Sequence, residues 1–326
     1  MEIYLAADIG GTKSLLGLFT REGGPRAPVR AESVTTSAYA SAEALVGDFL
    51  DGQRVDGGML AVAGPVGGDH TPGSTLPWDI EHAPLAAAVD GPLALMNDLE
   101  ATATFVPYLN DGEVELLHDV PRSPDGVIGV VAPGTGIGEA ILVRTAAGAV
   151  AVASEAGHTD FAPNGELQTE YLVFLRERFG HVSLERACSG SSMPLLYEFL
   201  SSCGRAQADR EIAAAVATAD DATPLILQSG LSETCEACTL ALDTFVAMLA
   251  AAAGDLALQA VATGGIYLGG GIPPRILPAL RRSMFLEAFA DKGRFGTLTR
   301  TIPVGVILEP RTALFGAAWR ALSDAS

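Results

Sequence analysis

Positively charged residues are scarce in this sequence. Its 326 residues include 39 Asp and Glu but 20 Lys and Arg, and the formal net charge is −19. Two lysines are present, Lys13 and Lys292. Nucleic acids and anionic membranes are bound through Lys and Arg, so this balance argues against both as partners. It does not exclude a nucleotide cofactor, because backbone amides and a metal ion can hold phosphates inside an acidic protein.

Long hydrophobic runs are also missing. No uninterrupted stretch reaches the roughly 18 apolar residues that a membrane-spanning helix needs. The most apolar segments, such as 127–132, are short and bounded by Gly or Pro, which is typical of buried strands. The N-terminus enters a strand-like run without a basic leader or a cleavage site. These features predict a soluble, cytoplasmic protein.

Cysteine is rare, with four residues in the chain. Cys235 and Cys238 form one C-x-x-C pair, but no second pair follows at a spacing that would complete a zinc site of about four ligands. We therefore interpret the thiols as structural or incidental, and not as metal or redox groups. A reducing cytoplasm is their natural setting.

Strand-like and helix-like segments alternate along the chain, and its length suits two domains of roughly 150 residues. This mixture predicts an α/β fold with helices packed on sheets. The predicted strands are 3–8, 14–19, 58–63, 93–96, 127–132, 139–143 and 304–308, and the predicted helices are 41–50, 167–179 and 237–261.

One pattern occurs twice. A strand, a Gly/Thr turn and a second strand are predicted at 3–19, and the same order recurs at 128–143. Such an internal repeat indicates duplicated α/β domains that face each other across a cleft.

The first of these turns reads Asp8-Ile9-Gly10-Gly11-Thr12. Glycines let backbone N–H groups approach phosphate oxygens, the Thr12 hydroxyl adds a donor, and Asp8 can hold Mg²⁺ directly or through water. An ordinary tight hairpin is the alternative. Lys13 is either a phosphate partner or a solvated charge in the turn.

Two further glycine clusters extend the pattern. Gly134-Thr135-Gly136 is followed by a strand and lacks a G-K-[ST] ending, so a second phosphate clamp fits better than a dinucleotide fingerprint or a P-loop. Gly269-Gly270-Gly271 follows an apolar strand and precedes two prolines. It would admit an adenine or ribose, or it is simply a strand-to-helix corner.

A carboxylate and an amide, Asp98 and Asn97, end the predicted strand 93–96. Open α/β sheets bind ligands at this end of their strands, and phosphoryl transfer to a hydroxyl needs a carboxylate within hydrogen-bond reach of that hydroxyl. Read locally, however, the pair is better explained as an Asx cap for a following helix.

Glu155 and His158 lie in the segment Ser154-Glu155-Ala156-Gly157-His158-Thr159-Asp160-Phe161. Their spacing in a tight loop would point both into one pocket, where a carboxylate and an imidazole can bind a polyhydroxyl ligand. A structural histidine or a metal ligand at His158 are the alternatives.

Together these residues resemble the bacterial glucokinase family of the hexokinase–actin–Hsp70 ATPase superfamily, over nearly the whole chain. The motifs that carry the resemblance are Asp8–Thr12, Ala61–Val66, Asn97-Asp98, Gly134–Gly138, Glu155–Pro163, Gly180–Arg186, Ser189-Gly190, Gly269–Gly271 and Asp291–Phe295. The resemblance implies two RNase H-like domains of the actin/hexokinase type that flank a cleft. The smaller would comprise 1–108 and 300–326, and the larger 109–299.

The resemblance also implies ATP-dependent phosphorylation of glucose at its 6-hydroxyl, the first step of glycolysis, by a cytoplasmic homodimer. Asp98 would be the catalytic base and Asp8 the Mg²⁺ residue. The implied sugar-binding residues are Asn97, Glu155, His158, Glu185 and Thr75, and the implied ATP-binding residues are Asp8, Gly10, Gly11, Thr12, Lys13, Gly134, Thr135, Gly136, Gly270 and Gly271.

One position departs from the family pattern. Thr75 stands where many relatives carry Asn, and a hydroxyl in place of an amide leaves the choice of hexose open. Two other functions of the same fold also stay open: a non-catalytic sugar sensor, and a kinase for an acyl group or an amino sugar.

Overall fold

The computed structural model describes residues 1–326 except 68–69, 72–75, 90, 147 and 325–326. The chain divides into two units of mutually contacting residues. Unit 1 comprises Met1–Asn110, Ala140–Ala153 and Glu309–Ser326, and unit 2 comprises Asp111–Glu139 and Ser154–Leu308. The predicted domain limits, 1–108 with 300–326 and 109–299, stay a prediction.

Unit 1 is built on a five-stranded sheet in the order β3-β2-β1-β4-β7. β1, β2 and β3 are antiparallel, whereas β4 and β7 run parallel to β1. The register pairs Asp8 of β1 with Ala61 of β4, and Val62 of β4 with Asn97 of β7. The strands are β1 (Tyr4–Ile9), β2 (Lys13–Phe19), β3 (Arg30–Thr35), β4 (Gly57–Val62) and β7 (Leu93–Asn97), and a separate pair is β5 (His70–Thr71) and β6 (Ile80–Glu81).

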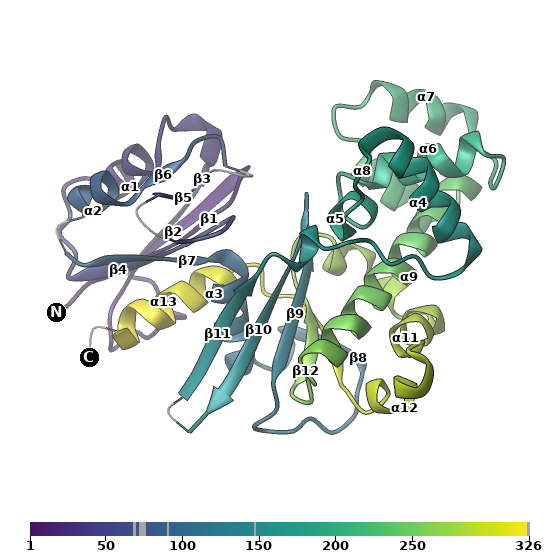
Figure 1. The fold of residues 1–326 in the computed structure, drawn as a ribbon. Coiled ribbons are helices and arrows are strands. Elements are labelled where there is room, and N and C mark those ends of the chain that lie inside the picture. Colours follow the sequence, from purple (N-terminus) through teal and green to yellow (C-terminus); the bar gives the residue numbers. More distant parts are fainter. Residues whose placement is uncertain (68–69, 72–75, 90, 147, 325–326) are drawn as a thin grey trace. The chain divides into compact units, whose positions relative to one another are not determined.

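Helices cover both faces of this sheet (Figure 1), and a hydrophobic cluster lies on each face. Leu5, Ala7 and Ile9 face α1 (Ala42–Leu50) and α2 (His82–Ala88), whereas Tyr4 and Ala6 face α13 (Thr312–Asp324). Side chains alternate along a strand, so Asp8 lies on the α13 side of the sheet. The remaining helices of this unit are α3 (Asp98–Phe105), η1 (Thr36–Ala38) and η2 (Val106–Tyr108).

A second sheet has the strand order β11-β10-β9-β12-β13-β8. β12 runs parallel to both β9 and β13, and β8 is antiparallel to β13. The strands are β8 (Val114–His118), β9 (Ile128–Pro133), β10 (Ile137–Thr145), β11 (Gly148–Ser154), β12 (Gly265–Leu268) and β13 (Val304–Ile307).

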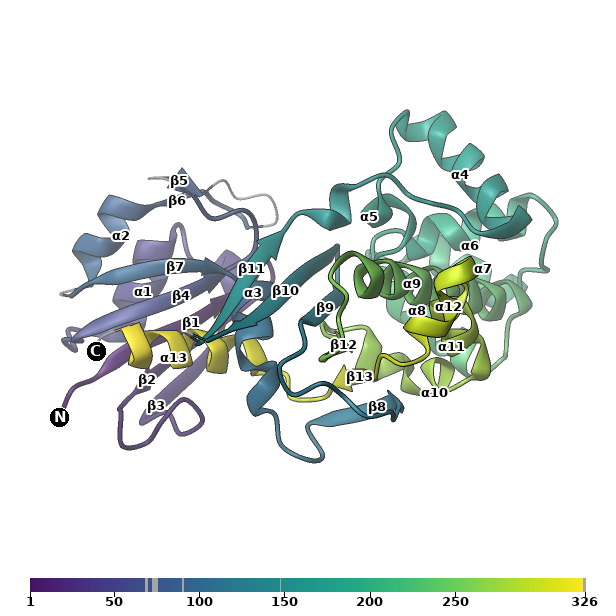
Figure 2. The same ribbon diagram turned by 60° about the horizontal axis from the view of Figure 1, so that its bottom comes forward.

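Helix α9 (Glu236–Gln259) is the core helix of unit 2 (Figure 2). It packs on β9 and β12 and is contacted by α6, α8 and α11, so most of its side chains are buried. By length and composition it is the one helix among the described residues that could cross a membrane, and its burial inside the unit explains its apolar composition. The other helices are α4 (Gly165–Phe179), α5 (Leu184–Ala187), α6 (Met193–Ser202), α7 (Arg210–Thr218), α8 (Thr223–Leu231), α10 (Leu277–Leu280), α11 (Ser283–Ala290) and α12 (Gly296–Thr299), with the 3-10 turns η3 (Ala156–His158), η4 (Pro273–Ile276) and η5 (Gly293–Phe295).

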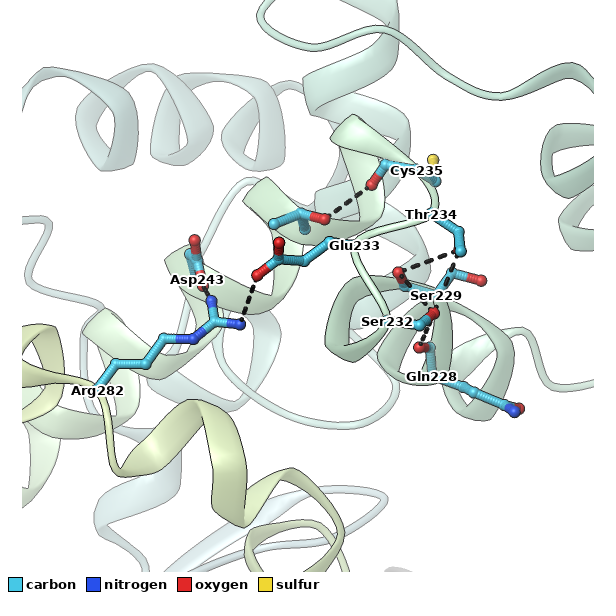
Figure 3. Close-up of polar contacts among 9 residues, drawn as sticks. Gln228, Ser229, Ser232, Glu233, Thr234, Cys235, Asp243 and Arg282 are labelled. Atoms are coloured by element: carbon cyan, nitrogen blue, oxygen red, sulfur yellow. Dashed lines mark hydrogen bonds and ion pairs between the residues drawn. The ribbon is translucent and has the colours of Figure 1, made fainter.

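Polar contacts hold the junction between α8 and α9 (Figure 3). Arg282, which precedes α11, donates to Asp243 of α9 at 2.8 Å and to Glu233 at 3.2 Å. Cys235 is the N-cap residue of α9, and both Cys235 and Cys238 are buried free thiols. The C-x-x-C pair is therefore part of the packing at the start of α9.

The predicted strands and helices are all present, with ends that differ by no more than two residues. Both strand–turn–strand repeats are confirmed, as β1–β2 and β9–β10. Ser41 caps α1, because its hydroxyl accepts a hydrogen bond from Ala44 N at 3.2 Å. The α/β class is confirmed as well.

Candidate active site

In unit 1 the parallel strands β1, β4 and β7 end at the same edge of the sheet. Asp8 is the last residue but one of β1, and Asn97 is the last residue of β7. Asp98 follows at the first position of α3. The fold therefore brings the two predicted carboxylates to one edge, where α/β sheets bind ligands.

The Asp8 and Asp98 carboxyl groups are close enough to influence each other. Burial raises the pKa of Asp8 to about 7, and the negative charge of Asp98 adds to this increase. Two carboxyl groups that repel each other at a strand end are suited to a divalent cation, which prefers carboxylate and water oxygens. The donor set at Asp8 therefore fits the predicted Mg²⁺.

Asn97 and Asp98 both accept hydrogen bonds at the start of α3, since Leu99 N donates to Asp98 Oδ1 at 2.9 Å as well as to Asn97 Oδ1. The Asn97 side chain caps α3, accepting hydrogen bonds from Leu99 N at 2.9 Å and Glu100 N at 3.2 Å. Its amide nitrogen donates to Gly64 O at 3.1 Å, which joins the ends of β7 and β4. The helix-cap interpretation is confirmed for Asn97, and Asp98 is held at the start of the helix.

The turn at Gly10–Thr12 is closed by a hydrogen bond from Gly10 N to Lys13 O at 3.2 Å. Thr36, at the start of η1, fixes it from the side: its hydroxyl donates to Gly10 O at 2.6 Å, and its N–H donates to Thr12 O at 3.0 Å. Thr12 and Lys13 themselves are exposed. The geometry leaves their side chains accessible to a ligand.

In unit 2 the turn at Gly134–Gly136 is anchored by a neighbouring segment. Gly190 N donates to Gly134 O at 2.8 Å, and Ser191 N donates to Thr135 O at 3.1 Å. A Cβ at position 190 would lie 2.5 Å from Gly134 O, so this approach requires glycine. The anchoring segment leads into α6 (Met193–Ser202).

Glu185 lies on α5 and contacts the same turn. Its carboxylate accepts a hydrogen bond from Ile137 N at 3.3 Å, and a Cβ at Gly136 would lie 2.2 Å from Glu185 Oε2. Glu185, which is predicted to bind sugar, therefore lies next to the turn at Gly134–Gly136, which is predicted to bind phosphate, and both belong to unit 2.

Glu155 and His158 lie on one turn around η3. His158 Nε2 is 3.8 Å from Glu155 Oε2, and both side chains are more than half exposed. The following residues pair with the segment before α5, since Phe161 N donates to Val182 O at 3.0 Å. Unit 2 therefore brings Glu155, His158 and Glu185 into neighbouring, packed elements.

The glycine cluster 269–271 lies beside the end of β9. Gly269 N donates to Val131 O at 2.9 Å, and Gly270 has a φ of +79° with its Cβ position 2.5 Å from Pro133 O. The cluster leads into η4, so it is a strand-to-helix corner. Gly271 is open on its Cβ side, and a planar ligand at this corner stays a prediction.

Sequence reasoning did not assign roles to Thr36, Gly64, Gly190 or Ser191. Each acts through a backbone group or a hydroxyl that holds a predicted turn or cap. Gly64 and Gly190 lie in motifs that carry the family resemblance, whereas no local pattern marks Thr36 or Ser191. Thr75 lies outside the described residues. Across the described part of the chain, no cluster of three or more His, Cys, Asp and Glu side chains is arranged to hold a metal ion.

Two α/β units that each carry a Gly/Thr turn, one with carboxylates at the sheet edge, define a phosphotransferase of the actin/hexokinase type. A glucokinase structure from an Antarctic psychrotroph has the same fold, with a TM-score of 0.81, 30% identity and coverage of 98% of this chain and 99% of that chain. The glucokinase of Balamuthia mandrillaris, solved with glucose, has a TM-score of 0.84 at 20% identity, covering 98% and 93%.

The family follows from the sequence match. The glucokinase family model matches residues 5–324. The glucokinase of Photorhabdus laumondii is 34% identical over 97% of this chain and 96% of its own length. The chain belongs to the glucokinase family.

Proposed function

We propose that this protein transfers the γ-phosphoryl group of ATP to the 6-hydroxyl of glucose, giving glucose 6-phosphate for glycolysis. The observation that carries the proposal is the placement of Asp98, which α3 and its Asn97 cap hold at the carboxyl edge of the sheet near Asp8. The family relationship supports the substrate and the reaction.

Asp98 would act as the general base. It would accept the proton of the sugar hydroxyl as the phosphoryl group transfers in line from its donor. Its position at the first residue of a capped helix limits its movement, and a fixed base is what such a transfer requires.

Asp8 would hold Mg²⁺, directly or through water. The ion, when bound, would neutralise charge on the phosphates. The backbone amides of the two Gly/Thr turns would bind the phosphate oxygens, and the corner at Gly270 and Gly271 would contact the adenosine. The proposed phosphate-binding residues are Gly10, Gly11, Thr12, Lys13, Gly134, Thr135 and Gly136.

The sugar would be bound through Asn97, Glu155, His158, Glu185 and Thr75. Glu155 and Glu185 offer carboxylate acceptors, and the exposed imidazole of His158 can donate to or accept from a hydroxyl. The Ile137 N–H on Glu185 would orient its carboxylate for that contact.

We further propose a cytoplasmic homodimer that binds neither nucleic acid nor membranes. The charge of −19 supports the last two points, since anionic surfaces would repel the chain.

A coupled ADP-release assay over a panel of sugars and acyl substrates tests the function. We expect turnover with glucose and ATP, and weaker or no turnover with carboxylates. Polyphosphate and ADP are tested as alternative donors. Sugar binding without turnover for any combination of substrate and phosphate donor would instead indicate a sensor. Turnover with acyl substrates alone would also contradict the proposal.

A further inference from the structure

Unit 2 contains a cavity of about 190 Å³ that none of the predicted sugar or phosphate residues lines. It lies between β10, helix α9 and the loop that follows η3. At about 30 Å³ per molecule it has room for roughly six waters, or for an organic molecule of similar size.

Glu139 of β10 is the unusual residue of this cavity. Its side chain lines the cavity although the residue is 5% exposed, and it forms no hydrogen bond or ion pair with any described residue. A buried carboxylate without a partner is unfavourable unless it is protonated or matched by a cation. Burial and the nearby charge of Asp255 raise the pKa of Glu139 to about 7.

The other charged groups around the cavity do not neutralise Glu139. Asp255 lines the cavity from α9 and is paired with Lys292, whose Nζ donates to Asp255 at 2.6 Å and to Ala251 O at 2.9 Å. Asp160 lines it from the loop and is bonded to His181 at 2.8 Å. The cavity therefore has a net negative lining.

The rest of the lining is mixed. Phe161, Leu184 and Met248 contribute apolar walls, and Thr159, Gln168 and Gln259 contribute hydrogen-bonding groups. Among the described residues, the carboxylates of the cavity do not form a cluster arranged to hold a metal ion. A cavity with apolar walls and a few polar groups is typical of sites for small organic ligands, and an aromatic ring also attracts an ammonium group.

We propose that this cavity binds a small organic ammonium compound, with the ionised Glu139 carboxylate as the partner of the ammonium group and the apolar walls as the contact for its alkyl chain. The proposal does not depend on the proposed kinase function, because it concerns separate residues and is tested by binding.

Calorimetric titration with n-butylammonium chloride tests the site, with n-butanol as an uncharged ligand of similar size. We expect wild type to bind the amine and not the alcohol. Glu139→Gln, which keeps the shape and removes the charge, should weaken amine binding about tenfold or more. Glu177→Gln, the same change at an exposed position of α4, should leave it unchanged.

The pH dependence gives a second measurement. An alkylamine stays protonated near neutral pH, since its pKa is about 10. Binding should therefore strengthen from about pH 6 to about pH 8 in wild type, as Glu139 ionises, and stay flat in Glu139→Gln. The same pH dependence of amine binding in wild type and in Glu139→Gln would overturn the role of Glu139.

Occupancy can be located directly. Crystals soaked in 2-bromoethylammonium should show bromine anomalous scattering inside the cavity. If Glu139→Gln does not fold, Ala252→Leu, which fills the cavity from α9, should abolish binding instead. Bromine elsewhere, or binding of KCl or MgCl₂ in place of the amine, would overturn the proposal.

Discussion

Asn97 and Asp98 are neighbours in the chain, and both side chains accept a hydrogen bond from Leu99 N. Asn97 uses its oxygen to cap α3 and its nitrogen to bind Gly64 O, so its amide is engaged on both sides. Asp98 begins the helix that Asn97 caps. Asn97 therefore contributes to local stability as well as to the proposed sugar site, whereas Asp98 is the proposed base.

Asp98→Asn should reduce kcat by about 100-fold or more while sugar and ATP binding persist, because an amide cannot accept the proton. Steady-state kinetics and equilibrium binding of both ligands measure this. Asp51→Asn is the matched control, since Asp51 is exposed and its left-handed backbone conformation is tolerated by Asn. Near-normal turnover in Asp98→Asn would rule out this residue as the base.

Asn97→Ala should destabilise the protein by about 1–2 kcal/mol, because α3 loses its cap and Gly64 O loses its donor. Asn97→Ser should recover the part of this loss that comes from the cap, since a Ser hydroxyl can cap the helix. Urea unfolding of the three proteins measures the difference. Equal stability of wild type and Asn97→Ala would contradict the capping role.

Glu139→Gln should make the unfolding free energy less dependent on pH, in the absence of amines. The native pKa of Glu139 is raised from 4.5 to about 7, so the native state keeps this proton to higher pH than the unfolded chain. The resulting stabilisation is complete below about pH 4.5 and is lost as pH rises through about 7, by on the order of 3 kcal/mol. Urea unfolding over this range, with Glu177→Gln as control, should show a flatter curve for Glu139→Gln alone.

Among the elements, α13 shows how packing overrides local preference. It lies against α3 so closely that a Cβ at Gly316 would be 1.9 Å from Ala101 O. Ala is favoured over Gly in a helix by about 1 kcal/mol, but here the backbone of a second helix occupies the space.

Gly316→Ala should therefore destabilise unit 1 by about 1–3 kcal/mol. Gly47→Ala is the matched substitution, because Gly47 lies in α1 with no atom within 4 Å of its Cβ position. It should stabilise the protein by up to about 1 kcal/mol. Thermal unfolding of both variants measures the contrast, and a shift of the same sign in both would contradict the close contact.

The chain as a whole has a large excess of acidic over basic residues. With a net charge of −19, self-repulsion opposes the compact state at low ionic strength. Salt screens such repulsion, with a Debye length of about 10 Å at 0.1 M.

Raising NaCl from about 0.01 M to about 0.2 M should thus increase Tm by a few degrees, with little further gain above that range. Calorimetry in a buffer near neutral pH measures the change. A control with an uncharged solute at the same osmolality distinguishes the screening of charges by salt from the exclusion of solute from the protein surface. A fall in Tm with salt would show that favourable ion pairs outweigh the repulsion.

Most strands, both Gly/Thr turns and the family could be predicted from the sequence, because each is marked by residues that lie within a few positions of one another. The strands β3, β5, β6, β8 and β11 were not predicted. Only the folded chain shows which segments meet: Asp8 with Asp98, Thr36 with the first turn, Glu185 with Gly136, and Glu139 with the cavity beside α9. The physical reason is that strand order and helix packing bring distant segments together, and local periodicity does not encode which segments become neighbours.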